Sequence, residues 1–85
     1  MAKYPIFLDL HDKRVVVIGG GKVATRKVST LLNSGARIIV VAENIDQPLT
    51  RICEENNAEL IQATYSSEYL NGAVMCIAST NDSEL

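Results

Sequence analysis

The chain has 85 residues, a formal net charge of −2, 47% hydrophobic residues and 21% charged residues. These proportions are ordinary for a globular domain and exclude a disordered, collagen-like or low-complexity chain. The eight lysines and arginines are scattered, so no basic stripe predicts nucleic-acid binding. No apolar run approaches the roughly 18 residues of a membrane span. The first residues carry no evident secretory signal, and the expected location is therefore cytoplasmic.

The cysteine and histidine content argues against a metal centre. Cys53 and Cys76 form no Cys-x-x-Cys pair, and His11 is the single histidine, whereas zinc sites group several such ligands. Cys53 shares an expected helix face with Leu49, and Cys76 lies inside an apolar run. We expect both thiols to be buried and unreactive. We expect His11, in a turn, to be exposed.

The first two expected elements are a strand and a helix joined by three glycines. Residues 14–18, RVVVI, lack polar alternation, which is typical of a strand buried on both faces of a parallel sheet. Gly19-Gly20-Gly21 ends this run. Residues 22–33 then carry apolar side chains at helical spacing. Gly35 follows at the position where helices often end in a left-handed residue.

The remaining pattern predicts a parallel α/β sheet. Asp46 and Pro48 mark the start of a second helix. The expected elements after the first helix are a strand at 38–42, a helix from about 46 to 57, a strand at 59–61, a helical turn at 66–70 and a strand at 73–78. Such alternation is typical of a doubly wound, Rossmann-like sheet with right-handed crossovers.

The sheet of this fold class normally has more strands than this chain provides. About four strands are expected here, and residues 79–85 resemble the start of another unit. A doubly wound dinucleotide domain continues to a fifth and sixth strand. We therefore expect residues 1–85 to be one NAD-binding Rossmann domain, the N-terminal part of a longer protein, truncated before the fifth strand.

The glycine turn fits the pattern G-x-G-x-x-G/A, with Gly19, Gly21 and Ala24 in the small positions. Gly19 permits the tight turn, Gly21 lets a pyrophosphate approach the backbone, and Ala24 lets the helix pack on the strands. The unpaired N–H groups that open the helix then bind the anion. A glycine-rich turn can also serve only to join a strand to a helix. Its place in a βαβ unit of about 30 residues favours a dinucleotide site.

Glu43 is the candidate for recognising the adenosine ribose. It follows Gly21 by 22 positions, at the end of the second expected strand, close to the roughly 20 typical of this site. A carboxylate there accepts hydrogen bonds from ribose hydroxyls and repels a 2′-phosphate. No cation follows until Arg51, so the sequence favours NAD over NADP. The alternative is an ordinary solvated loop carboxylate.

Other candidates follow from the rule that ligands bind outside the carboxyl ends of parallel strands. Asn44 lies beside Glu43, and Ser79-Thr80 follow the fourth expected strand. The hydroxyls of Ser79 and Thr80 face the cofactor on this interpretation; alternatively they start a turn and cap a helix. Lys22, near a helix N-terminus, either gains from a bound anion or is simply solvated.

Longer segments carry a more specific likeness: YPIFLDL at 4–10, KRVVVIGGGKVA at 13–24, RK at 26–27, LLNSGAR at 31–37 and IASTND at 77–82. Together they resemble the precorrin-2 dehydrogenase/sirohydrochlorin ferrochelatase family, the N-terminal dehydrogenase module of siroheme synthase. The likeness covers essentially the whole chain. The lead-in at 4–10 distinguishes it from oxidoreductases of other substrate classes.

This resemblance implies that precorrin-2 is oxidised to sirohydrochlorin by hydride transfer to NAD. Several members of the family also insert iron into the product. The implied NAD contacts are Gly19, Gly21, Lys22 and Val23 at the pyrophosphate, Glu43 and Asn44 at the adenosine end, and Ser79 and Thr80 nearer the nicotinamide.

The resemblance also implies a tetrapyrrole substrate and a homodimer of the full-length protein through regions absent here. The family's catalytic carboxylate would fall after Leu85, so no residue of this chain is assigned a catalytic or metal-binding role, and we expect the segment alone to be inactive. Two other readings remain open: a non-catalytic module that senses NAD or another nucleotide, and an oxidoreductase of another substrate class.

Overall fold

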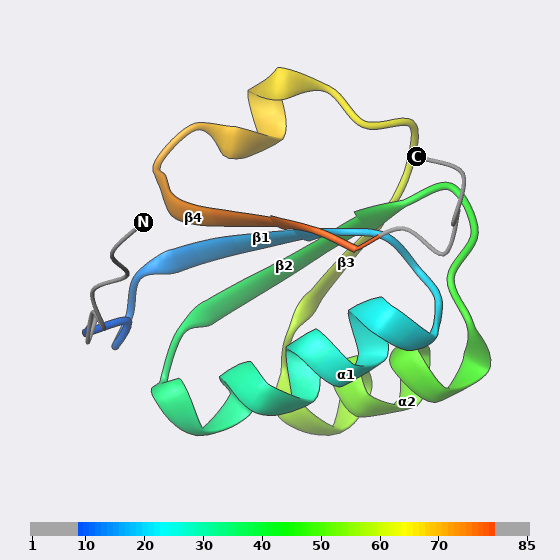
Figure 1. Cartoon of the computed structure of the whole chain (residues 1–85), viewed down its shortest axis with the longest axis horizontal. Helices are drawn as coiled ribbons and strands as arrows, with labels where there is room; N and C mark the ends of the chain where they lie inside the picture. The colour runs from blue at the N-terminus through cyan, green and yellow to red at the C-terminus, as the bar shows by residue number, and fades with distance from the viewer. Residues whose placement is uncertain (1–8, 80–85) are drawn as a thin grey trace, which may run out of the picture.

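The computed structural model describes residues 9–79, which build one parallel sheet with its two α-helices on a single face (Figure 1). The sheet has four strands in the order β3-β2-β1-β4. Their bounds are β1 (Arg14–Ile18), β2 (Arg37–Ala42), β3 (Glu59–Gln62) and β4 (Ala73–Ala78). This is the central strand order of a Rossmann-like sheet, so the predicted α/β fold class is confirmed.

The first helix, α1 (Lys22–Leu31), is shorter than the periodicity predicts. Its last expected residues form the 3₁₀ turn η1 (Leu32–Ser34), and Gly35 ends it with a φ of 76°. This left-handed residue confirms the predicted helix stop. The second helix, α2 (Gln47–Asn56), follows Asp46 as predicted, with Pro48 in its first turn.

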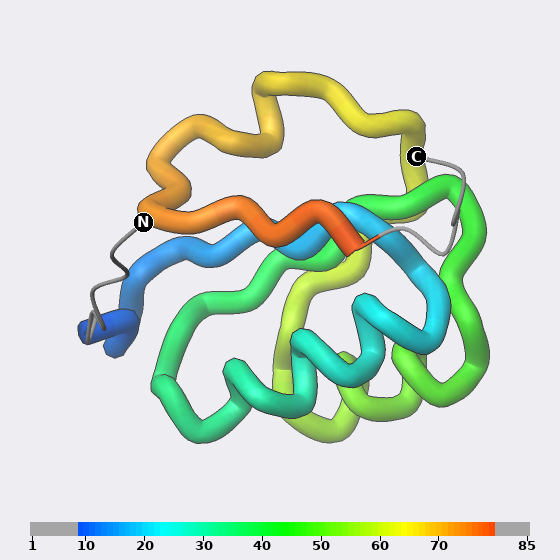
Figure 2. The backbone as a smooth tube through the Cα atoms, in the orientation of Figure 1, coloured from blue at the N-terminus to red at the C-terminus, as the bar shows by residue number. Residues whose placement is uncertain are grey.

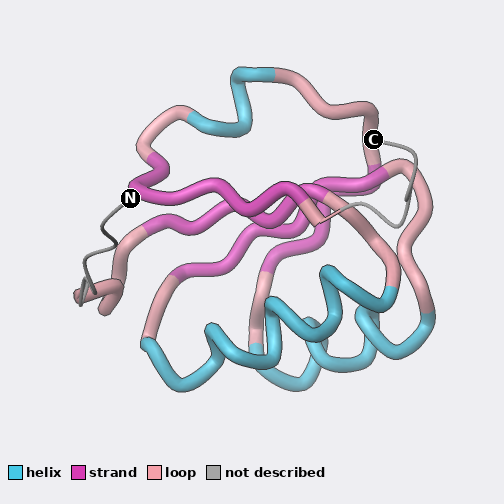
Figure 3. Tube along the Cα trace, viewed as in Figure 1, coloured by secondary structure: helices cyan, strands magenta, loops and turns pink. Residues whose placement is uncertain are grey.

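The third crossover contains no α-helix. Between β3 and β4 the chain forms only the 3₁₀ turn η2 (Ser67–Leu70), whose start is capped by the Ser66 hydroxyl accepting from the main-chain N–H of Glu68. Figure 3 shows this connection on the face of the sheet opposite α1 and α2. The two faces are therefore covered unequally: one by two helices, the other by a loop.

The helix face of the sheet holds most of the core. Val15 and Val17 of β1, Ala24 and Val28 of α1, and Leu49 of α2 are all fully buried there. Burial of this aliphatic surface is the main favourable term in folding. On the opposite face, which we call the η2 face, Val16, Ile39 and Val41 form a smaller cluster against Tyr69 and Leu70. The absence of polar alternation in β1 is thus explained, because both its faces are covered.

β4 differs from the other apolar strands because alternate side chains along it are exposed. Val74 is 56% exposed, and Cys76, which pairs with Val16 in register, is exposed as well. Among the described residues β4 is an edge strand, and every second residue along it is exposed. The prediction that both thiols are buried is therefore right for Cys53 and wrong for Cys76.

The structure contains no helix, within residues 9–79, that is long and apolar enough to cross a bilayer.

The two thiols should differ in reactivity. Burial raises the pKa of the Cys53 thiol, which lowers its thiolate fraction, and the packed core blocks access. In the folded chain we expect Ellman's reagent to modify Cys76 at least about tenfold faster than Cys53, since Cys53 reacts only through local opening. Cys76→Ser should remove the fast phase, and denaturant should abolish the difference. Equal rates in the folded chain would contradict this packing.

Truncation of a valine to alanine should lower the free energy of unfolding by different amounts on buried β1 and on the exposed side of β4. Val17→Ala removes two methyl groups from a fully buried site and should lower the free energy of unfolding by about 2–3 kcal/mol. Val74→Ala, on the exposed side of β4, should cost about 0.5 kcal/mol or less. Urea denaturation of both variants measures the difference, and similar costs would show that Val74 is covered.

Candidate functional site

The glycine turn lies at the carboxyl-end edge of the sheet, between two other chain segments (Figure 2). On one side, the N–H of Gly19 donates to Val41 O at 3.0 Å and the N–H of Asp46 donates to Gly20 O at 2.7 Å. On the other side, the N–H of Ser79 donates to Ile18 O at 2.7 Å. Main-chain hydrogen bonds therefore tie the ends of β1, β2 and β4 together around the turn.

Two of the glycines allow main chain to approach main chain. A Cβ on Gly19 would lie 1.9 Å from Ser79 O, and a Cβ on Gly20 would lie 1.8 Å from Asn44 O. Gly19 also has a φ of +135°, a conformation that L side chains rarely adopt. Neither position can accept a side chain without moving backbone. The predicted role of Gly19 in the tight turn agrees with this geometry.

Gly20 is a structural requirement that the sequence pattern missed. It occupies a variable position of G-x-G-x-x-G/A, so the motif assigned it no role. The constraint comes from Asn44, which follows β2 and reaches Gly20 only in the folded sheet. The only sequence signal was the unusual third glycine in the run, which has no unique interpretation.

Gly21 is the residue before α1, and it is buried. Its carbonyl accepts from the main-chain N–H of Thr25 at 3.0 Å and from the Thr25 hydroxyl at 2.9 Å. No side chain caps the start of α1, and its first turn has no acidic residue. Within residues 9–79, no acceptor pairs with the N–H groups of Gly21, Lys22 or Val23. These donors lie at the positive end of the helix dipole and are available to an anion.

The side chains of the first three residues of α1 differ in how deeply they are buried. Lys22 is exposed, Val23 is half-buried and Ala24 is fully buried in the core between α1 and the sheet. The packing role predicted for Ala24 is confirmed by this burial. A contact between Ala24 and a ligand would involve its main-chain N–H rather than its methyl group.

Glu43 and Asn44 follow β2 at the same edge, and both are exposed. The carbonyl of Glu43 accepts from the Gln62 side-chain amide at 3.0 Å, and the carbonyl of Asn44 abuts Gly20. Their main chain is therefore fixed beside the glycine turn, while the Glu43 carboxylate forms no ion pair within the described part of the chain. Gln62 was not among the sequence candidates, although its place at the carboxyl end of β3 was a usable signal.

Ser79 is the most buried polar residue of the site. It is 2% exposed, and its Oγ has no hydrogen-bond partner among residues 9–79. Buried hydroxyl groups are nearly always paired with protein, water or ligand, so an unpaired one beside Gly19 is consistent with a ligand at this edge. Thr80, the other candidate predicted after this strand, lies outside the described residues.

No cluster of metal-ligating side chains occurs in the portion of the chain that the structure describes. His11 is 73% exposed, and its Nε2 lies 3.4 Å from a carboxylate oxygen of Asp12. The prediction that His11 is exposed is therefore confirmed. The site at the carboxyl-end edge is built from main-chain donors, one carboxylate and one buried hydroxyl, which is a donor set for a nucleotide rather than a metal.

Comparison with known proteins also indicates a nucleotide-binding domain. A family described as "Putative NAD(P)-binding" matches residues 6–85. The siroheme synthase of Nitrosospira multiformis is 45% identical over 82 residues, which cover 92% of this chain and 17% of that protein. Siroheme synthase 1 of Pectobacterium atrosepticum is 40% identical over 81 residues, or 95% of this chain and 17% of the relative. The chain thus spans less than a fifth of the length of the curated relatives it matches.

A solved structure is also similar. SirC, a precorrin-2 dehydrogenase, superposes with a TM-score of 0.86 at 29% sequence identity, covering 96% of this chain and 41% of that one. The glycine turn, its unpaired amides and the strand order are those of a dinucleotide-binding fold, and with the match over residues 6–85 they show that this chain belongs to the NAD(P)-binding family.

Proposed function

We propose that this chain is the NAD-binding portion of a precorrin-2 dehydrogenase, which oxidises precorrin-2 to sirohydrochlorin on the way to siroheme. The similarity to SirC and to siroheme synthases supports this assignment. The observation that carries it is the set of unpaired amides at the start of α1, held between two backbone contacts that only glycine permits.

The pyrophosphate of the dinucleotide is assigned to the amides of Gly21, Lys22 and Val23. They combine unpaired N–H donors with the positive end of the α1 dipole. Lys22 is exposed next to this position and adds a positive charge toward the same anion. Ala24 belongs to the site through its main chain and its small, buried side chain.

The adenosine end of the dinucleotide is assigned to Glu43 and Asn44. The exposed carboxylate of Glu43 accepts hydrogen bonds from the ribose hydroxyls and repels a 2′-phosphate. The main chain of this pair is held by the Gln62 side chain at Glu43 and lies against Gly20 at Asn44, so the point from which the Glu43 side chain extends is fixed. This arrangement favours NAD over NADP.

The nicotinamide half is assigned to the end of β4, where the unpaired Ser79 hydroxyl lies beside the glycine turn; Thr80 is the second candidate. When bound, the nicotinamide supplies the acceptor for the hydride that the substrate loses. Ser79 contributes a hydrogen bond that orients the ligand. No described residue is assigned as the acid or base of the reaction.

The remaining features of the whole protein are part of the same proposal. The substrate is a tetrapyrrole and the full-length protein is a cytoplasmic homodimer. Iron insertion into sirohydrochlorin, which several members of the family perform, is the second activity to test in that full-length protein. These rest on the family resemblance and on the siroheme synthase relatives.

Titration with NAD and with NADP tests the cofactor assignment. We expect NAD to shift the backbone NMR signals of residues 19–24 and of Glu43 and Asn44, and to bind more tightly than NADP. Glu43→Gln removes the charge that repels the 2′-phosphate and should lower the preference for NAD at least about fivefold. Glu54→Gln, an equal charge change at an exposed position on α2, should leave it unchanged. Tighter NADP binding by the unaltered chain would contradict the role of Glu43.

A turnover assay separates cofactor binding from catalysis. We expect the 85-residue chain, incubated with precorrin-2 and NAD, to form no sirohydrochlorin, because the family resemblance implies that the catalytic carboxylate falls after Leu85. A full-length siroheme synthase is the positive control, and absorbance of the product is the measurement. Product formation by this chain would contradict the proposed division of the protein. A full-length parent protein that bound NAD without turnover would instead favour the nucleotide-sensing module.

A further inference from the structure

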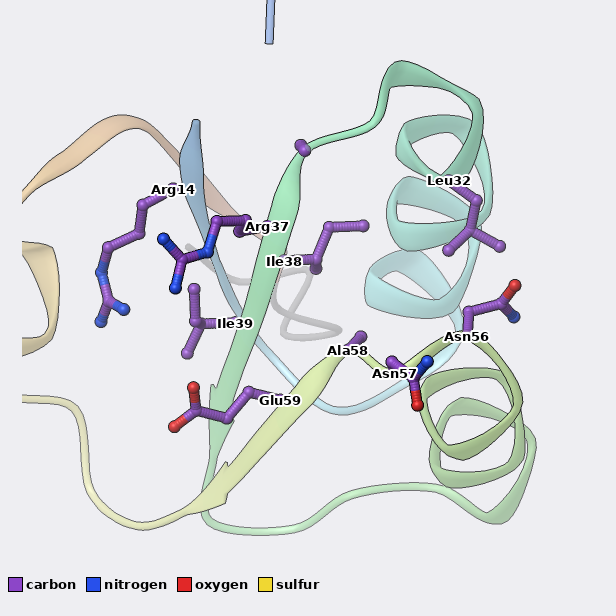
Figure 4. Close-up of a pocket in the computed structure, with 10 residues that line it drawn as sticks. Arg14, Leu32, Arg37, Ile38, Ile39, Asn56, Asn57, Ala58 and Glu59 are labelled. Atoms are coloured by element: carbon purple, nitrogen blue, oxygen red, sulfur yellow. The ribbon is translucent and has the colours of Figure 1, made fainter. Parts of the chain in front are cut away.

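The amino-end edge of the sheet, opposite the glycine turn, carries a cluster of charged residues that the proposed function does not use. Arg14, Arg37 and Glu59 are the first residues of β1, β2 and β3. Arg14 pairs with Arg37 in register, and Glu59 pairs with Ile39, two residues further along β2. A pocket of about 390 Å³ opens at this edge. All three charged residues line it on one side of the sheet, and most of its other lining residues lie on the helix side (Figure 4).

The two arginines extend from the same side of the sheet. Side chains alternate along a strand, so Arg14 shares a side with Val16 and Arg37 shares a side with Ile39, which is the η2 face. Figure 4 shows both side chains and that of Glu59 on one side of the sheet, with Asn56 and Asn57 on the other. The arginines therefore lie away from the helix layer, where the carbonyl ends of α1 and α2 would disfavour an anion.

The Arg14 side chain is held in a fixed position, but not all of its N–H donors have an acceptor. Its Nη2 donates to the main-chain oxygen of Tyr69 in η2 at 3.0 Å. Its Nε is buried and has no acceptor among the described residues. A guanidinium group has five N–H donors in a planar fork, so one recorded bond leaves donor capacity on a side chain whose geometry is already set. This pre-organisation lowers the entropy cost of binding a ligand.

The positive charge of the pair is not neutralised within residues 9–79. The single ion pair there joins His11 and Asp12, so Glu59 lies beyond ion-pair distance from both arginines. Like charges directly opposite on neighbouring strands repel each other. An anion that bridges the two guanidinium groups would remove this repulsion and accept hydrogen bonds from both.

We propose that Arg14 and Arg37 form a second ligand site, which binds a phosphate or carboxylate group of a small molecule at the amino-end edge of the sheet. Both groups match the planar donor fork of arginine. The five residues of β1 separate this site from the dinucleotide site by roughly 15 Å at the usual rise per residue. Glu59, on the third strand, lowers the affinity for anions and so limits the site to ligands that engage both arginines.

NMR titration of the chain with inorganic phosphate, and separately with succinate, tests this proposal. We expect saturable shifts of the Arg14 and Arg37 side-chain Nε–H signals with at least one of the two anions. Tighter binding of phosphate identifies a phosphorylated ligand, and tighter binding of succinate identifies a carboxylate ligand. The assignment of signals to residues separates these shifts from any caused by phosphate at the glycine turn.

Three variants test the direction in which anion affinity should change. Arg37→Gln should weaken anion binding at this edge at least about fivefold, because a charge-assisted hydrogen bond is lost. Glu59→Gln should strengthen binding about two- to threefold, because a repelling charge is removed. Arg51→Gln, an equal charge change at an exposed position on α2, should have little effect. Arg37 is exposed, so its substitution should leave the fold intact.

The proposal fails if neither anion shifts the arginine signals in a saturable way, or if Arg51→Gln weakens binding as much as Arg37→Gln, which would indicate general charge attraction. It also fails if Glu59→Gln weakens binding. This test is independent of the dinucleotide assignment, because Arg37→Gln should leave NAD affinity unchanged. The arginine site and the dinucleotide site can therefore be disproved separately.

Discussion

Direct contact between main-chain segments at the glycine turn is the constraint on which the carboxyl-end edge of the sheet depends. Gly19 lies against the carbonyl of Ser79 and Gly20 against the carbonyl of Asn44, at distances that leave no room for a Cβ. Because the segments after β1, β2 and β4 meet in this way, the start of α1, the carboxylate of Glu43 and the hydroxyl of Ser79 all lie at one edge. A side chain in the turn would separate these groups.

The same contact explains why the site relies on main-chain donors. The amides of Gly21, Lys22 and Val23 begin a helix that no side chain caps, so they are free to bind an anion without a dedicated side chain. In the proposed assignment, side chains refine this recognition: Glu43 binds the ribose, and Ser79 supplies a buried hydroxyl. The match of residues 6–85 to an NAD(P)-binding family and the similarity to SirC agree with a site of this kind.

The two ends of the sheet use different chemistry. At the carboxyl end, glycines bring backbone together and donors point outward. At the amino end, the in-register pairing of β1 with β2 brings Arg14 beside Arg37, and the charge resides on side chains. We propose an anion site at each end, and the two sites use separate elements. Arg14 also bonds to η2, so the amino-end cluster stabilises the one crossover that lacks an α-helix.

The sequence by itself determined the strand–helix alternation, the left-handed stop at Gly35 and the small residues of the glycine motif, because these depend on local periodicity and backbone conformation. It also identified Glu43 and Ser79 as edge residues from their position after a strand. Only the tertiary structure decided the requirement for Gly20, the exposure of Cys76 and the pairing of Arg14 with Arg37. These features depend on which strands are neighbours and in what register, and residues far apart along the chain carry no local signal of that pairing.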